Sequence, residues 1–182
     1  MIIRRAALYD TSAISNIARC VGVDRSSTRK SGLIELNLDR EGYEKRIHGN
    51  SFAFLAENHS QKITGFFVGY YSGFLKRLME IDGHAASDEI MQFVHNLPEP
   101  FVYGDQLAVL PGFSGQGVAT ALYDRTLKEM KERYLTVLYA AVAHAPWRNV
   151  EFVDFLAKRG HVLVDETTNS SGLTFGIYEK KL

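Results

Sequence analysis

Residues 102–130 read VYGDQLAVLPGFSGQGVATALYDRTLKEM, and this stretch decides the fold. Its first residues alternate as in a β-strand, which we expect to end at Pro111 because proline cannot donate to a strand ladder. The glycine-rich turn Ser114–Ala119 follows, and then a helix is predicted by apolar residues at spacings of three and four. The predicted buried stripe is Ala119, Tyr123, Leu127, Met130 and Tyr134, and the predicted solvent face carries Lys128, Glu129, Lys131 and Glu132.

A strand, a glycine turn and a helix in succession can hold phosphate. The first N–H groups of a helix lack an intrahelical acceptor, and the helix dipole is positive at that end. Glycines let the backbone approach an anion without a Cβ in the way. Two nucleotide-binding motifs do not match, because Gly117 is not followed by the Lys of a Walker A loop and Thr120 replaces the third Rossmann glycine. The structural alternative is a glycine turn that only allows close helix packing.

The turn resembles the coenzyme A pyrophosphate loop of the GNAT N-acetyltransferase superfamily. That family has Arg or Gln, two residues, Gly, one residue and Gly or Ala after a strand that ends in Val-x-Pro. This chain has Val109-Leu110-Pro111 and then Ser114–Ala119, with Ser114 where the family usually has Arg or Gln. The difference removes one side-chain contact to phosphate and leaves the backbone cradle.

A second match with the family involves Asn149 and Gly160. Many members have Asn and, eleven residues later, Gly-Phe, with a tyrosine between them that protonates the leaving thiolate. Here His161 replaces the Phe, and Leu156 occupies the position of the tyrosine. Asn149 itself is either a cofactor contact or the cap of a helix.

The order of predicted elements is similar to the whole GNAT fold. Strands are expected at 2–6, 51–57, 62–72 and 135–142, with a helix at 149–159 and a closing hairpin after it. An insertion at about 73–100 contains a helix that Ser87 could cap. The resemblance implies one domain over residues 1–182 with an α/β fold, in which helices cover both faces of a mixed, mostly antiparallel central sheet.

The family resemblance also implies a function. It predicts an N-acetyltransferase that uses acetyl-CoA as cosubstrate and acetylates the amine of a small molecule or peptide. The alternative is a non-catalytic domain that binds or senses acyl-CoA, and Leu156 supports it. The expected cofactor contacts are Leu107, Ala108, Val109, Ser114, Gly115, Gln116, Gly117, Val118, Ala119 and Asn149.

Catalytic candidates follow from the same resemblance. The fourth and fifth strands of the family splay apart, and the pantetheine arm lies in the gap. Some members place an acid at this depth as general base, which here is Asp105, expected on one strand face with Tyr103 and Leu107. The alternative for Asp105 is a hydrogen-bonded acid near the sheet surface. His144 and Tyr139 could both reach the cleft. A histidine has an ordinary pKa of roughly 6.5, which suits acid–base catalysis near neutral pH. The alternative for His144 is a surface histidine without a catalytic role. The candidates are therefore Asp105, Tyr103 and His144.

Composition restricts the other function classes. The 182 residues have zero net charge, so we expect no nucleic-acid partner. We expect no signal peptide, membrane span or metal site, and the single Cys20 fits a cytoplasmic location. The basic residues Arg25, Arg29 and Lys30 form either a solvated loop or a contact for an acidic acceptor. Both a monomer and a homodimer fit the sequence.

Overall fold

The computed structural model describes residues 1–22 and 38–182, so the expectations for Arg25, Arg29 and Lys30 lie outside the described residues. The strands are β1 (Ile2–Arg5), β2 (Ala53–Glu57), β3 (Ile63–Tyr71), β4 (Val102–Val109), β5 (Val137–Ala145), β6 (Val162–Thr168) and β7 (Thr174–Lys181). The α-helices are α1 (Thr11–Val21), α2 (Arg40–Ile47), α3 (Ser72–Ile81), α4 (Gly83–Ser87), α5 (Glu89–His95), α6 (Val118–Glu132) and α7 (Val150–Ala157). Short 3₁₀ turns are η1 (Leu8–Asp10) and η2 (Pro111–Phe113).

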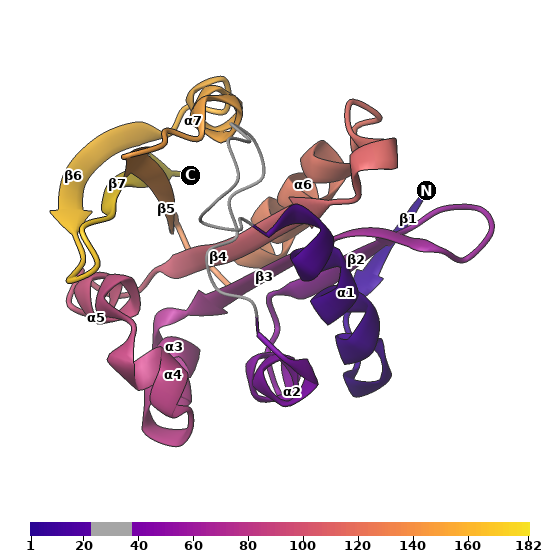
Figure 1. Ribbon diagram of the computed structural model, residues 1–182, viewed down its shortest axis with the longest axis horizontal. Helices are drawn as coiled ribbons and strands as arrows, with labels where there is room; N and C mark the ends of the chain where they lie inside the picture. Colours follow the sequence, from indigo (N-terminus) through magenta and orange to yellow (C-terminus); the bar gives the residue numbers. More distant parts are fainter. Residues whose placement is uncertain (23–37) are drawn as a thin grey trace.

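All seven strands join one sheet in the order β1-β2-β3-β4-β5-β7-β6 (Figure 1). Neighbouring strands run antiparallel except β4 and β5, which are parallel. Helices α1 to α5 contribute to the apolar core on one face of the sheet, and α6 and α7 cover the other face. The predicted α/β fold with a mostly antiparallel sheet and two covered faces is therefore confirmed.

Strand β3 lies inside the sheet, between β2 and β4, and is buried along most of its length. Its side chains are apolar on both faces, which suits a strand with helices above and below. Phe66 and Val68 face the core of α1 to α5, and Phe67 faces the core of α6.

The segment between β3 and β4 folds into α3, α4 and α5. These helices bury Leu75, Leu78 and Met91 in the same core that α1 and α2 cover. Helix α5 begins one residue later than expected, because Asp88 and not Ser87 is its cap. The Asp88 Oδ1 atom accepts hydrogen bonds from Ile90 N at 2.9 Å and Met91 N at 3.0 Å.

The buried stripe of α6 differs from the predicted one. Tyr134 lies beyond the end of the helix, has a φ of 57° and is 91% exposed. Glu129, expected on the solvent face, is 2% exposed and accepts hydrogen bonds from three arginines. The positive charges of the arginines compensate the buried carboxylate. The spacing of apolar residues in the sequence cannot reveal such a pairing. The buried residues of α6 are Val118, Leu122, Tyr123, Thr126, Glu129 and Met130.

Strands β4 and β5 separate soon after they meet. They pair only at Val102 with Leu138, Tyr103 with Tyr139, and Gly104 with Ala140. Both strands continue beyond these pairs, and β5 turns away from β4 in Figure 1. The sheet therefore opens from Asp105 onward, as the family resemblance predicted.

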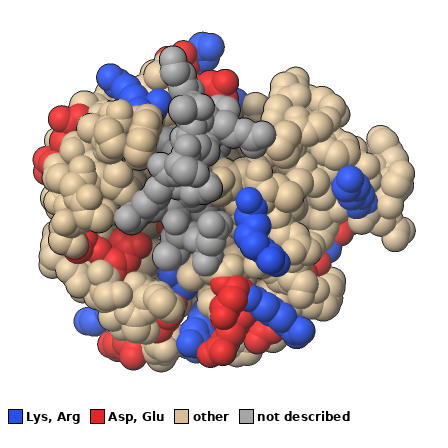
Figure 2. Space-filling view, viewed as in Figure 1, with Lys and Arg blue, Asp and Glu red and all other residues tan. Residues whose placement is uncertain are grey.

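The surface carries both signs of charge. Figure 2 shows basic and acidic side chains interspersed on one face, without a broad patch of either sign. Among the described residues, no helix has both the length and the apolar character that a membrane crossing requires.

Candidate functional site

A β-bulge in β4 sets the position of Asp105. Gly104 lies opposite Gly69, and Gln106 lies opposite Val68. Asp105, between them, therefore has no paired residue on β3. An extra residue of this kind re-aims the side chains next to it. Asp105 and its neighbour Gln106 consequently point to the same face, where they accept hydrogen bonds from Tyr70 and Tyr43, respectively.

The bulge also corrects one expectation about the faces of β4. Tyr103 and Asp105 share a face as expected, because both lie among the side chains of the α1-to-α5 core. Leu107 does not share it, since it packs against the opposite core, with Phe67. The extra residue at position 105 shifts the alternation of all following residues by one.

Asp105 lies immediately after the last β4–β5 pair, at the start of the opening between these strands. Its side chain is 11% exposed, and Oδ2 accepts a hydrogen bond of 2.7 Å from the Tyr70 hydroxyl. Arg46 Nε lies 4.0 Å from the same oxygen. Burial raises the pKa of Asp105 to about 6, while the Arg46 charge and the Tyr70 hydrogen bond limit the rise. The carboxylate is therefore ionised at neutral pH and is protonated at mildly acidic pH.

Arg46 and Tyr70 are residues of this cluster that sequence reasoning missed. Arg46 is fully buried and forms an ion pair with Asp82, which ends α3. The sequence contains a signal for the burial of Arg46, because Arg46 follows Tyr43 by three residues and so lies on the same, buried face of α2. Its partner, 36 positions away, could not be foreseen.

Tyrosines complete the surroundings of Asp105. Burial, and then the Asp105 charge, raise the pKa of Tyr103 and of Tyr70 well above the ordinary value. Both hydroxyls are therefore neutral and can donate. Tyr139, on the neighbouring strand β5, donates a 3.0 Å hydrogen bond to Glu179 and is thereby held toward β7.

His144 lies elsewhere. Its Nδ1 atom is 2.5 Å from Glu166 Oε1, and its Nε2 atom is 2.9 Å from the Tyr178 hydroxyl. Tyr178 belongs to the core beneath α7, on the sheet face opposite Asp105. The structure therefore does not bring His144 together with Asp105 and Tyr103, and its contacts link β5 to β6 and β7.

The glycine turn has the conformation that an anion cradle needs. Gly115 and Gly117 have φ values of 75° and 79°, and a Cβ at either position would meet no atom within 4 Å. Gln116 Nε2 donates to Gly112 O at 3.1 Å and braces the turn. In the described part of the chain, the first N–H after Gly117 with a backbone acceptor is that of Ala121. The N–H groups of residues 115–120 have no backbone acceptor among the described residues and are available to a ligand, whereas Ser114 N donates to Pro111 O at 3.2 Å.

Helix α7 and its two ends hold three of the positions that correspond to the family's motif. Asn149 caps this helix, since its Oδ1 accepts from Phe152 N at 3.1 Å, so the capping alternative is confirmed and a cofactor contact stays a prediction. Gly160 has a φ of 78° after the helix end. Leu156 is 2% exposed and packs on Ala140. The position of the family's tyrosine is thus part of an apolar core.

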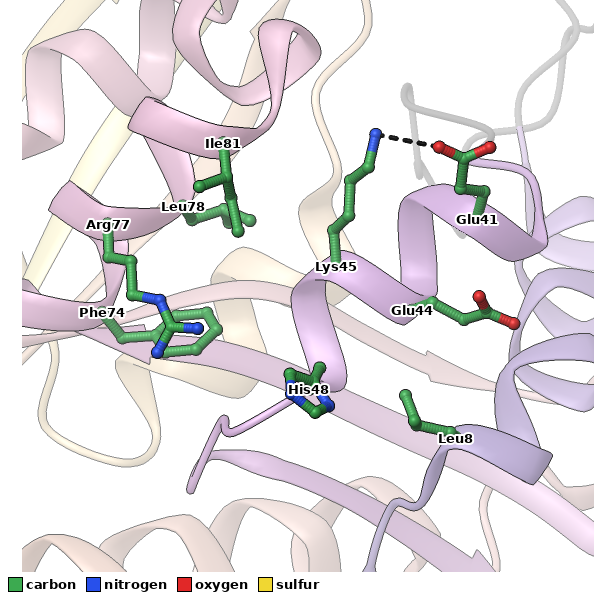
Figure 3. A pocket seen from close by; sticks show the side chains of 9 residues that line it. All are labelled: Leu8, Glu41, Glu44, Lys45, His48, Phe74, Arg77, Leu78 and Ile81. Atoms are coloured by element: carbon green, nitrogen blue, oxygen red, sulfur yellow. Dashed lines mark ion pairs between the residues drawn. The ribbon is translucent and has the colours of Figure 1, made fainter.

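A separate groove of about 280 Å³ lies between α2 and α3 (Figure 3). Phe74 and Leu78 contribute apolar surface, and Lys45 at its edge pairs with Glu41 at 3.1 Å. Neither Asp105 nor the glycine turn lines it. Its full lining is Leu8, Glu41, Glu44, Lys45, His48, Phe74, Arg77, Leu78 and Ile81.

Residues 1–22 and 38–182 contain no group of three or more His, Cys, Asp or Glu side chains arranged to hold a metal ion.

Comparison with known proteins agrees with the fold. The model of the acetyltransferase (GNAT) family matches residues 24–160. No curated protein matches the chain significantly. The ribosomal-protein-alanine N-acetyltransferase of Brucella melitensis has a TM-score of 0.66 at 16% identity, with all of both chains covered.

Two ligand-bound structures are also similar in fold. The yncA protein of Salmonella typhimurium, solved with its cofactor acetyl-CoA, has a TM-score of 0.64 at 15% identity, covering 100% of this chain and 94% of that one. Arabidopsis thaliana Naa50, in complex with the bisubstrate analogue CoA-Ac-MVNAL, has a TM-score of 0.67 at 13% identity. That match covers 100% of this chain and 98% of Naa50.

Proposed function

Because this chain belongs to the GNAT acetyltransferase family, we propose that it transfers the acetyl group of acetyl-CoA to the amine of a small molecule or peptide. The observation that carries the proposal is the position of Asp105 at the start of the opening between β4 and β5. The carboxylate faces one side of the sheet, and the glycine turn leads into α6 on the other side. A cofactor and an acceptor could therefore meet in the opening from opposite faces.

The residues at the glycine turn fit a coenzyme A pyrophosphate. The space beside Gly115 and Gly117 is open, and the N–H groups at the start of α6 have no competing acceptor among the described residues. Backbone amides at a positive helix end suit a doubly charged anion. Ser114 is exposed and too short to add the contact of the family's Arg or Gln.

The pantetheine arm would lie along the free edge of β4. Leu107, Ala108 and Val109 follow the last β4–β5 pair, so their backbone on the β5 side is not used by the sheet. An extended ligand can occupy such an edge in the manner of an added strand.

Asp105 is proposed as the general base. An alkyl amine has a pKa of roughly 10, so it must lose a proton before it can attack a thioester. A carboxylate whose pKa lies at about 6 is a stronger base than an ordinary aspartate and is still ionised at neutral pH. Bound acetyl-CoA would supply the activated acyl thioester, and the neutral hydroxyl of Tyr103, on the same face as Asp105, is a candidate proton donor to the departing thiolate.

The absence of a tyrosine at position 156 does not exclude catalysis. A thiol has a pKa of roughly 8.5, so a departing thiolate needs little help from an acid at neutral pH. Leu156 nevertheless keeps the second function open, a domain that binds acyl-CoA without turning it over.

The identity of the acceptor is also part of the proposal. The analogue bound to Naa50 includes a peptide, so short peptides with free N-termini belong in an acceptor panel beside small amines. A cytoplasmic location and a monomeric or homodimeric state stay predictions.

The proposal is tested by release of free thiol from acetyl-CoA with a panel of peptides and small amines. Gly117→Asp places a negative charge in the cradle and should abolish most coenzyme A affinity in a titration. Gly172→Asp is the matched control, because Gly172 also has a positive φ, 82°, and open space, but lies in the β6–β7 turn. Equal affinity in both variants would contradict the cradle. Binding without thiol release for any acceptor would favour the sensing domain.

A further inference from the structure

We propose that Arg159 binds a phosphate group of coenzyme A and so supplies the cationic side chain that is absent at position 114. The inference rests on the proposed function, because it assumes that coenzyme A occupies the glycine turn. Arg159 lies directly before Gly160, but it is not one of the residues by which the chain resembles the family.

Arg159 follows α7 but reaches across to α6. Its Nη2 donates to Thr120 Oγ1 at 2.6 Å. Thr120 belongs to the first turn of α6, three residues after Gly117. The guanidinium is thereby fixed beside the helix end whose N–H groups form the cradle.

Aromatic contacts hold the guanidinium in place. Its central carbon lies 3.6 Å from the centroid of the Phe155 ring and 5.4 Å from that of Tyr123. Nη1 also donates to Phe155 O at 3.1 Å. A guanidinium has five N–H donors, and the hydrogen bonds to Thr120 and Phe155 use two of them. The guanidinium is already ordered, is partly exposed and has unused N–H donors, so it loses little conformational entropy when it binds phosphate.

The charge of Arg159 has no acidic partner among residues 1–22 and 38–182. Within the described residues, no carboxylate lies within ion-pair distance of its guanidinium, whereas Arg4, Arg5 and Arg46 each have an acidic partner. Lys180 Nζ adds a second cation nearby, donating to Arg159 O at 2.6 Å. Burial, together with the charges of Lys180 and Arg159, lowers the pKa of the adjacent His161 to about 4, as expected in a positive environment.

The dipoles of α6 and α7 favour the binding of an anion beside Arg159. Arg159 suits the negative C-terminal end of α7, but it also lies against the positive N-terminal end of α6, where a cation is unfavourable. A phosphate group between Arg159 and the α6 N–H groups would relieve that repulsion and accept charge-assisted hydrogen bonds from both.

Two phosphate sources exist within coenzyme A, the pyrophosphate and the 3′-phosphate. Arg159→Met keeps the aliphatic stem over Phe155 and removes the charge. We expect it to weaken coenzyme A binding about tenfold, with a matching rise in KM for acetyl-CoA and little change in kcat. Kinetics with S-acetylpantetheine, which lacks phosphate, should not change. Lys128→Met, an exposed charge loss on α6, is the control and should leave affinity unchanged.

Dephospho-coenzyme A separates the two sources. If Arg159 contacts the 3′-phosphate, wild type and Arg159→Met should bind this analogue equally. If it contacts the pyrophosphate, the roughly tenfold difference should persist. Thr120→Val, which removes the anchoring oxygen without changing charge, should weaken binding by a smaller factor.

A purely structural role gives different results. Equal loss with S-acetylpantetheine and acetyl-CoA, or unchanged coenzyme A affinity in Arg159→Met, would overturn the inference while the proposed function stands. If wild type bound no coenzyme A, the proposed function would fail and this inference with it.

Discussion

The Tyr70 hydroxyl donates a 2.7 Å hydrogen bond to Asp105 Oδ2 and so joins strand β3 to the bulge of β4. The bond stabilises the ionised carboxylate, as does the charge of Arg46, while burial opposes ionisation. The balance leaves Asp105 able to change protonation state near neutral pH, which an ordinary surface aspartate does not do.

Asp105→Asn should lower kcat by roughly 10², because the amide cannot accept the proton of the acceptor amine. In wild type, kcat/KM should rise as pH increases through about 6, where Asp105 ionises. The variant should lose that rise. A pH–rate profile from thiol release measures both effects, with Asp154→Asn as a control because Asp154 is an exposed acid on α7. Full activity with an unchanged profile would place the base elsewhere.

Tyr70→Phe should shift the same pH dependence. Without the phenol donor, the ionised form of Asp105 loses a hydrogen bond, and its pKa should rise further, by roughly half to one unit. The acidic limb of kcat/KM should therefore move to higher pH, while activity well above that limb stays close to wild type. A limb that does not move would mean that Asp105 is not the group observed.

Asp105 should also make stability depend on pH. Its pKa is about 6 in the folded protein against 3.8 as the ordinary value. Between these values the folded state keeps a proton that the unfolded state releases, so this group destabilises the fold as pH rises, by up to about 3 kcal/mol. Asp105→Asn lacks this titration. The free energy of unfolding of the variant, relative to wild type, should therefore increase from about pH 4 to about pH 6. Parallel curves for the two proteins in urea denaturation would contradict the burial argument.

Glu129→Gln should destabilise the protein at neutral pH by about 2–3 kcal/mol. Burial opposes ionisation of Glu129, but hydrogen bonds from Arg133, Arg5 and Arg125 lower its pKa below the ordinary value. Its contribution is therefore complete above the unfolded-state pKa and is lost as pH falls through the folded-state pKa. Denaturation at neutral and at strongly acidic pH should show the gap closing. Glu132→Gln, at an exposed site on the same helix, should have little effect at either pH.

Several parts of the site could be predicted from the sequence because their causes are local. Proline at 111 ends β4, and Gly115, Gly117 and Gly160 have the positive φ angles that glycine tolerates. Asn149 caps α7 through a bond to a residue three positions away. Each of these features depends on a few consecutive residues, so the printed order of amino acids determines it.

Other parts were decided only by tertiary structure. The bulge at Asp105 exists because of the register between β3 and β4, which places Tyr70, 35 positions away, against the carboxylate. The burial of Glu129 depends on Arg5 of β1, and the position of His144 depends on contacts with β6 and β7. Strand register and long-range charge compensation involve residues far apart in the chain, and no local periodicity contains them. The sequence therefore determined the family, the order of the elements along the chain and the conformation of the glycine turn, while folding decided which side chains meet in the opening between β4 and β5.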